Sequence, residues 1–175
     1  MLGRLLFANC EYQNYSNFIK PFEGFSSSVY FCSQGKRTVG WGTNLEFKNV
    51  SYVVGQEINL DLINLWFNQD VALAVDDCHK LYPSFDSHPE SVRLILVDLR
   101  YNLGLTGLRK FERFNLAINK RDYLLAAKEL EDSRYFRQTG LRARNHVESL
   151  KNKNETFNLY NFSKTTTNRG MGCSL

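Results

Sequence analysis

Three residues in the N-terminal part of the chain have side chains suited to acid–base chemistry. Eight residues separate Glu23 from Cys32, and five separate Cys32 from Thr38. A carboxyl group can protonate a leaving oxygen, a thiolate can act as a base or nucleophile, and a hydroxyl can hold a water molecule. Glu23 is the only carboxylate between positions 23 and 45, and it lies near Phe22 and Phe25, so apolar surroundings would raise its pKa. These residue types predict hydrolysis of a bond with a poor leaving group.

A hairpin is predicted to position these groups. Two β-prone runs, VYFC and RTVGW, flank the turn sequence SQGKR, and a short loop with a glycine is typical of hairpins. With the turn at residues 33–37, Cys32 is expected directly opposite Thr38, with both side chains on one face. Lys36 and Arg37 would favour the thiolate of Cys32 if they point inward. A short helix over residues 12–22 is expected to be distorted near Pro21, with Glu23 just beyond its end.

The same stretch resembles the catalytic segment of the phage-type lysozymes, glycoside hydrolase family 24. Their pattern is Glu, then Asp or Cys, then Thr and Gly-x-Gly. It is matched in type and spacing by Glu23, Cys32, Thr38, Gly40 and Gly42. Cys32 stands where Asp is commoner, and Thr43 stands where many members have His. The resemblance implies an inverting muramidase with Glu23 as general acid and Cys32 as base, nucleophile or electrostatic support. Thr38 would hold the attacking water.

Two segments of the second half also resemble this family. They are LVDLRYNLGLTGLRKF, similar to its central helix, and KELEDSRYFRQTGLRARN, similar to its C-terminal segment. The resemblance spans residues 14–150. It implies that a further set of residues binds substrate or supports the site: Gly42, Tyr101, Asn102, Tyr135 and Arg142.

The hydrophobic pattern predicts an α+β fold, and the resemblance implies that residues 1–150 form a single domain of the lysozyme-like kind. Residues 12–59 would form a small lobe containing the β-hairpin, and residues 83–150 an all-helical lobe. Residues 60–82 are predicted to form a connecting helix, because apolar residues recur at i, i+3 and i+4 after a potential cap at Asn59. Residues 151–175, rich in Asn, Thr, Lys and Ser, are expected to form a polar tail.

Local signals predict where the helices of the second lobe begin and end. Ser87 and Glu90 have the spacing of a capping box, and the apolar helix that follows is expected to end at Gly104. A further helix is expected to be capped by Asn119.

Charge and cysteine spacing bound the class of protein. The net charge is +4, and residues 100–153 hold thirteen Lys or Arg against six Asp or Glu. This basic half would suit an anionic polymer, but no nucleic-acid-binding motif accompanies it, so nucleic acid is not expected as a partner. The cysteines lie too far apart for a C-x-x-C pair or a zinc pattern, so neither a metal nor a cofactor is expected: Cys10, Cys32, Cys78 and Cys173. Apolar runs are too short for stable membrane insertion.

Two other functions stay open at this stage. The chain could be a catalytically inactive peptidoglycan-binding protein on the same fold. It could also be a cysteine hydrolase that pairs Cys32 with a histidine, although none of the three histidines lies in a hydrolase motif: His79, His88 and His146.

The resemblance implies a monomer acting on peptidoglycan glycan strands. It would be made in the host cytoplasm without a cleavable signal peptide and would act on the cell wall. Such an enzyme would depend on a holin-like protein to reach the wall and lyse the host.

Overall fold

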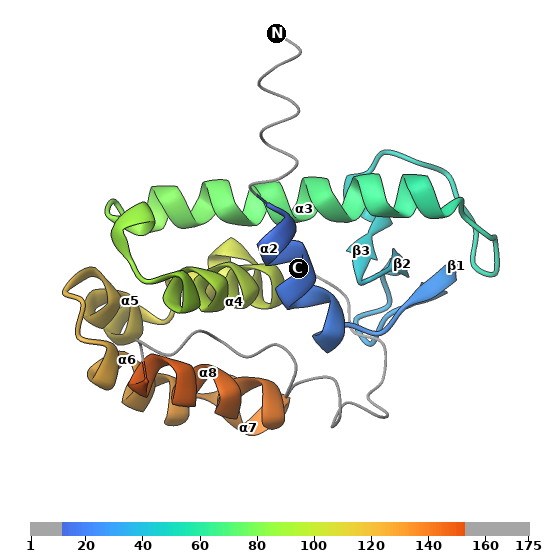
Figure 1. Cartoon of the computed structure of the whole chain (residues 1–175). Coiled ribbons are helices and arrows are strands. Elements are labelled where there is room, and N and C mark those ends of the chain that lie inside the picture. The colour runs from blue at the N-terminus through green and yellow to red at the C-terminus, as the bar shows by residue number, and fades with distance from the viewer. Residues whose placement is uncertain (1–11, 153–175) are drawn as a thin grey trace, which may run out of the picture.

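The computed structural model describes residues 12–152, and every structural statement below concerns these residues (Figure 1). A three-stranded sheet near the N-terminus is followed by helices, which confirms the predicted α+β, lysozyme-like fold. The longer elements are α2 (Gln13–Ile19), β1 (Ser26–Phe31), β2 (Arg37–Gly40), β3 (Thr43–Asn44), α3 (Leu60–Leu81), α4 (Glu90–Arg109), α5 (Glu112–Asn119), α6 (Tyr123–Glu131), α7 (Arg134–Thr139) and α8 (Leu141–Lys151). Short 3-10 helices are η1 (Lys20–Phe22), η2 (Leu45–Phe47) and η3 (Phe85–Ser87).

Helix α3 connects the two lobes, as predicted. Its N-terminal half lies beside the sheet and its C-terminal half beside helix α4 (Figure 1). The side chain of Asn59 accepts a 2.7 Å hydrogen bond from the Asp61 amide, which confirms the predicted cap. Twenty-two residues at about 1.5 Å each give a rod roughly 30 Å long.

This helix contributes to two hydrophobic clusters. Ile63 and Trp66, near its start, pack in the β-lobe cluster with Val29 and Val39. From Phe67 onward its buried hydrophobic residues belong to the larger cluster of the helical lobe. Trp41 packs against both clusters, so the end of strand β2 is held at the junction of the lobes.

The sheet is antiparallel in the order β1-β2-β3. It approaches helix α3 very closely at Gly40, where the backbone is left-handed with φ +64°. A Cβ atom built there would lie 2.3 Å from Cγ2 of Ile63. Glycine is required at this position both by the conformation and by the contact.

Two of the predicted helix ends in the helical lobe, at Ser87 and Asn119, are wrong, and a third, at Gly104, is confirmed. Ser87 lies in η3 and donates to the Ser84 carbonyl (2.8 Å), so it forms no capping box, and Pro89 precedes α4 instead. The predicted helix end at Gly104 is confirmed as a kink at φ 68°, ψ 166°, after which a second helical stretch continues to Arg109 within α4. Asn119 is the last residue of α5, and Asp122 caps α6 by accepting from the Leu125 amide (3.0 Å).

Within residues 12–152, no helix has the length and apolar content needed to cross a membrane. The predicted polar tail lies outside the described residues, except for Lys151, which ends α8, and Asn152.

Candidate active site

The carboxyl group of Glu23 lies where the N-terminal helical segment passes into the sheet. Pro21 falls within the 3-10 helix η1, and Glu23 follows in an extended conformation three residues before β1. The predicted distortion near Pro21 is therefore confirmed, because α2 itself ends at Ile19. The Glu23 side chain is only 7% exposed, and its Oε1 accepts a 2.8 Å hydrogen bond from Nη1 of Arg142.

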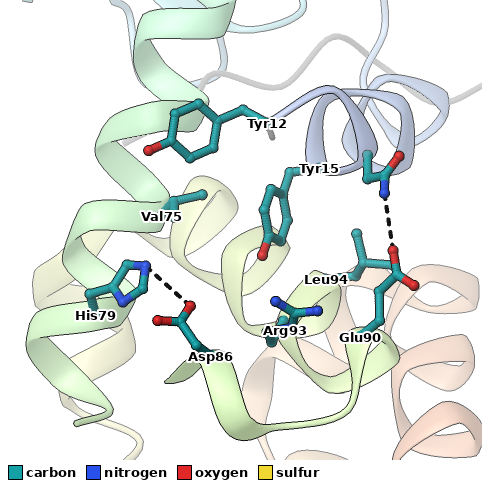
Figure 2. Close-up of a pocket in the computed structure, with 9 residues that line it drawn as sticks. Tyr12, Tyr15, Val75, His79, Asp86, Glu90, Arg93 and Leu94 are labelled. Atoms are coloured by element: carbon teal, nitrogen blue, oxygen red, sulfur yellow. Dashed lines mark hydrogen bonds and ion pairs between the residues drawn. The ribbon is translucent and has the colours of Figure 1, made fainter. Parts of the chain in front are cut away.

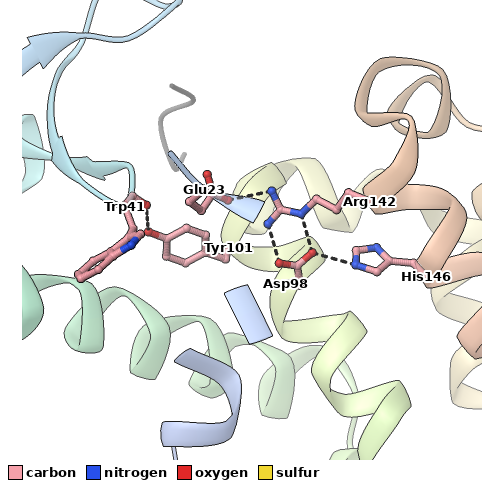
Figure 3. Close-up of polar contacts among 6 residues, drawn as sticks. All are labelled: Glu23, Trp41, Asp98, Tyr101, Arg142 and His146. Atoms are coloured by element: carbon pink, nitrogen blue, oxygen red, sulfur yellow. Dashed lines mark hydrogen bonds and ion pairs between the residues drawn. The ribbon is translucent and has the colours of Figure 1, made fainter. Parts of the chain in front are cut away.

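Arg142 joins Glu23 to a second buried carboxylate. Nε and Nη2 of Arg142 bind the two oxygens of Asp98 at 2.8 and 2.5 Å. Nε2 of His146, one turn further along α8, lies 3.0 Å from Oδ2 of Asp98. Figure 3 shows this line of contacts, which runs from Glu23 through Arg142 and Asp98 to His146 and so connects three parts of the chain.

Burial and charge act in opposite directions on the two carboxyl groups. Burial raises the pKa of Glu23, and the charge of Asp98 raises it further, whereas the charge and hydrogen bond of Arg142 lower it without reversing the shift. Burial alone would also raise the pKa of Asp98. There the Arg142 charge and the His146 and Arg142 hydrogen bonds prevail and lower it to about 2. Glu23 is thus the protonatable member of the pair.

The predicted register of the hairpin is wrong by two residues. Thr38 lies opposite Tyr30, and the Cys32 amide donates to the Lys36 carbonyl (3.0 Å) around a three-residue loop. Gly35, left-handed at φ +71°, closes this loop by donating to the Cys32 carbonyl (2.8 Å). Cys32 is two residues from Tyr30, so Cys32 and Thr38 still share one face of the hairpin, diagonally rather than directly opposed.

The side chains of Cys32 and Thr38 are both buried, and the hydroxyl proton of Thr38 is already used in a hydrogen bond. The Thr38 hydroxyl donates to the Lys36 carbonyl at 3.0 Å, which leaves its lone pairs as acceptors. Cys32 is a buried thiol. The guanidinium of Arg37 points elsewhere, because it binds Glu46 at 3.0 and 3.2 Å and the Tyr52 carbonyl at 2.9 Å, and Lys36 is exposed. The sequence-based suggestion that Arg37 favours the Cys32 thiolate is therefore wrong.

Tyr101 supports the backbone that carries Gly42. Its hydroxyl donates to the Trp41 carbonyl at 2.8 Å, and its ring packs on Phe67 with centroids 5.6 Å apart. This contact links α4 to the end of β2 (Figure 3). Gly42 follows Trp41 in a left-handed conformation, at φ 92°. Asn102, the next residue on α4, is partly buried.

Tyr135 and Arg142 both contact members of the buried network, Tyr135 through His146 and Arg142 through Asp98 and Glu23. The Tyr135 ring stacks on His146 with centroids 6.3 Å apart and an angle of 7° between the planes. The structure therefore places Glu23, Arg142 and Tyr135 around one network, whereas Cys32 and Thr38 belong to the hairpin and Tyr101 to the junction of the lobes. Their assigned roles in catalysis and substrate binding stay predictions.

Two members of the network were missed by sequence reasoning. Asp98 is a lone acid in the apolar run LILVDL, and a charged residue at such a position is seldom buried without a partner. His146 lies four residues after Arg142, so both project from one face of a helix. These two signals together could have identified the pair.

A pocket lies at the other end of α2, away from Glu23 (Figure 2). Ion pairing and hydrogen bonding occur across it: His79 contacts Asp86 at 3.6 Å, and Asn14 donates to Glu90 at 3.1 Å. None of the predicted site residues lines it; its walls are Tyr12, Asn14, Tyr15, Val75, His79, Asp86, Glu90, Arg93 and Leu94. Across the described part of the chain, no three His, Cys, Asp or Glu side chains are grouped to hold a metal ion.

Comparison with known proteins identifies the family. A search of curated proteins found no match. A family profile described as phage lysozyme matches residues 20–155, which covers the hairpin, α3 and the whole helical lobe, and more than half of the chain. This protein therefore belongs to the phage lysozyme family.

Proposed function

We propose that this protein is a muramidase that hydrolyses the β-1,4 bond between N-acetylmuramic acid and N-acetylglucosamine in bacterial peptidoglycan. Membership of the phage lysozyme family supports a lysozyme role in peptidoglycan hydrolysis. The observation that carries the proposal is the state of Glu23. Its carboxyl group is almost enclosed, accepts a hydrogen bond from Arg142 and has a pKa raised by burial.

A raised pKa is what a general acid needs. The leaving sugar oxygen must receive a proton as the glycosidic bond breaks, because an alkoxide is a poor leaving group. Burial of Glu23 disfavours its charged form and so maintains the proton that is transferred. In the proposed reaction Glu23 protonates the glycosidic oxygen.

The second role is assigned to the hairpin. Cys32 is proposed as the base, nucleophile or electrostatic support that acts on the opposite side of the sugar. The hydroxyl of Thr38 donates to the Lys36 carbonyl, which leaves its lone pairs as the acceptors proposed to hold a water molecule. With Cys32 as base, it takes a proton from this water as the water attacks the anomeric carbon, and the reaction inverts, as the resemblance implies; with Cys32 as nucleophile, the water would instead hydrolyse a glycosyl-enzyme intermediate and the configuration would be retained.

We assign the activity to host-cell lysis by a phage or prophage, with access to the wall through a membrane lesion made by a holin-like protein. Support for this role comes from the resemblance of the catalytic stretch and from the family match.

The test compares the wild type with Glu23→Gln and Cys32→Ser on purified peptidoglycan. Loss of turbidity measures solubilisation, and mass spectrometry of borohydride-reduced fragments identifies the new reducing sugar. Reduced N-acetylmuramic acid ends are expected with the wild type and not with Glu23→Gln. Glu90→Gln, which changes a carboxylate that accepts from Asn14 at the protein surface, is the control expected to retain activity.

Three outcomes would change the proposal. New ends on N-acetylglucosamine would assign a different glycosidic bond. Absence of clearing by the folded wild type, with retained sedimentation on peptidoglycan, would instead support the inactive binding protein. Clearing that persists in Cys32→Ser would reduce Cys32 to a packing role and leave Glu23, Thr38 and water.

A further inference from the structure

Asp98 controls how much of the Arg142 guanidinium is available to Glu23. The guanidinium has one edge formed by Nε and Nη2, and both atoms are bound by Asp98 at 2.8 and 2.5 Å. Only Nη1 contacts Glu23, through a single 2.8 Å hydrogen bond. The two-point contact is the stronger arrangement, because paired N–H groups match both carboxylate oxygens. Arg142 is therefore held primarily by Asp98.

Asp98 also lies against the imidazole of His146. Nε2 of His146 lies 3.0 Å from Oδ2 of Asp98, and the imidazole is enclosed. Its ring is stacked with Phe18 on one side and Tyr135 on another, at centroid distances of 6.1 and 6.3 Å. His146 therefore adds a second enclosed polar neighbour beside Oδ2 of Asp98, which also accepts from Nε of Arg142.

Charge balance then determines the state of Glu23. The titratable groups that face this buried volume are Glu23 after η1, Asp98 on α4, Tyr135 on α7, and Arg142 and His146 on α8. The charges of Arg142 and Asp98 cancel each other, and burial raises the pKa of Tyr135, so its hydroxyl stays neutral. Ionisation of Glu23 would leave one uncompensated negative charge in a region that excludes water, which is unfavourable.

We propose that Asp98 is a positioning residue for the general acid: by neutralising and anchoring Arg142, it keeps Glu23 protonated while leaving it one oriented hydrogen bond. This inference rests on the proposed function for its catalytic meaning, but the effect on Glu23 protonation is a property of the folded protein alone. The effects of the two charges on the pKa of Glu23 are consistent with this proposal, since the charge of Asp98 raises this pKa and that of Arg142 lowers it.

Replacement of Asp98 by Asn is the direct test. The amide keeps the shape but removes the negative charge, so Arg142 is left to pair with Glu23 and stabilise its carboxylate. The Glu23 pKa is expected to fall by about one unit or more. The alkaline limb of the pH–activity profile should move down by the same amount, with about tenfold less activity on that limb.

A matched control distinguishes this effect from simple loss of a buried ion pair. Asp77 binds Nε and Nη2 of Arg100 at 2.9 and 2.6 Å through one carboxylate oxygen, and it also contacts Lys80. This pair connects α3 with α4, and its ion pairs go to Arg100 and Lys80 rather than to the Glu23 network. Asp77→Asn is therefore expected to reduce stability but to leave the Glu23 pKa and the shape of the pH–activity profile unchanged.

Removal of Arg142 completes a double-mutant cycle. It also provides a second comparison that can be made if the Asp98→Asn variant does not fold. The Glu23 pKa, followed by carbon-13 NMR of the side-chain carboxyl with Glu23→Gln to assign the signal, should be highest in Arg142→Gln. It should return near the wild-type value in Asp98→Asn/Arg142→Gln and be lowest in Asp98→Asn. The NMR titration needs no substrate, so it reports on the network even if the protein proves not to be a glycosidase.

The proposal is overturned if Asp98→Asn does not lower the Glu23 pKa relative to the wild type, or if the double variant Asp98→Asn/Arg142→Gln has the same Glu23 pKa as Arg142→Gln alone. It is equally overturned if Asp98→Asn lowers activity by one factor at every pH, as Asp77→Asn would by loss of folded protein. A shifted Glu23 pKa without peptidoglycan hydrolysis by the wild type would retain the network but reject the proposed function.

Discussion

Glu23 and Arg142 are joined by a 2.8 Å hydrogen bond although 119 positions separate them in the chain. One partner follows the N-terminal helical segment, and the other lies on the last described helix, α8. Formation of this contact therefore requires the chain ends of the described region to be folded together. The free energy of unfolding should therefore depend on the protonation of Glu23.

Glu23→Gln should make the protein less sensitive to alkaline pH. Burial raises the pKa of Glu23, so the folded state binds its proton more tightly than the unfolded state does. The resulting stabilisation is fully present below the unfolded pKa and is lost as pH rises through the folded pKa. In thermal unfolding from about pH 4 to about pH 9, the melting temperature of the variant should therefore increase relative to that of the wild type as pH rises.

Glu90→Gln is the control for that experiment, since Glu90 accepts from Asn14 outside the buried network. The difference in melting temperature between Glu90→Gln and the wild type should not increase with pH as it does for Glu23→Gln. A constant difference between Glu23→Gln and the wild type across this range would contradict the assigned direction of the pKa shift.

Lys48 and Asp70 form a close ion pair, at 2.5 Å, between the segment after β3 and helix α3. Burial raises the pKa of Asp70, while hydrogen bonds from Lys48 and Thr43 oppose the rise. Lys48→Met removes the cation and leaves a mostly buried carboxylate, so a loss of about 2 kcal/mol in unfolding free energy is expected at about pH 7. The loss should shrink towards about pH 4, as Asp70 becomes protonated, and can be measured by urea unfolding.

Asp70→Asn is the partner variant that tests the reason for this loss. In the Lys48→Met background it removes the unpaired charge and should recover part of the lost stability. An additive result for the two changes would mean that the ion pair does not couple the two segments.

The extent of helix α3 was predictable because its signals are local. The apolar spacing over residues 60–82 and the capping side chain of Asn59 both lie within the element, and the structure shows a helix at Leu60–Leu81 with that cap. The cap predicted at Ser87 failed for a related reason. A neighbouring 3-10 turn uses the Ser87 hydroxyl, and local spacing cannot show which backbone group a side chain will choose.

The hairpin was predictable in existence but not in register. Gly35 indicated the turn, but its left-handed conformation selects a three-residue loop and shifts the pairing by two positions. Because side chains alternate between the two faces of a strand, a register shift of two residues keeps Cys32 and Thr38 on the same face, as predicted. The Asp98–Arg142–His146 contacts depend on how α4 packs against α8, and no spacing within either helix specifies that packing.

Gly40→Ala should be strongly destabilising. The new methyl group would meet Ile63 at 2.3 Å, and the residue would have to keep a left-handed φ of +64°. Overpacking and backbone strain together should cost about 2–4 kcal/mol, seen as a lower midpoint in urea. Trp66 packs in the same cluster as Ile63. The change in its fluorescence on unfolding should therefore occur at a lower urea concentration in the variant than in the wild type.

Gly55→Ala supplies the matched control, since this glycine is also left-handed, at φ +86°, but a Cβ there would have no atom within 4 Å. The difference between the two variants isolates the overlap with Ile63 from backbone strain. Equal losses at both positions would show that the close approach of the sheet to α3 contributes little.

Cys32→Asp is expected to retain peptidoglycan hydrolysis if residue 32 acts chemically. Aspartate is the commoner residue at the corresponding place in the family that this sequence resembles, and a carboxylate can serve as base or electrostatic support. Cys32→Ala keeps a small apolar side chain but no ionisable group, so it should lose about 100-fold or more in rate. Release of reducing sugars at several pH values measures both variants.

Cys78→Ala tests whether buried thiols matter only for packing. Cys78 is fully buried on α3, and burial raises its pKa well above the ordinary range, so its thiol stays neutral. This variant should lose stability through a small cavity and keep its activity per folded molecule. If Cys32→Ala behaves in the same way, the thiol at position 32 is a packing residue too. Hydrolysis would then have to proceed with Glu23 and a water molecule held by Thr38.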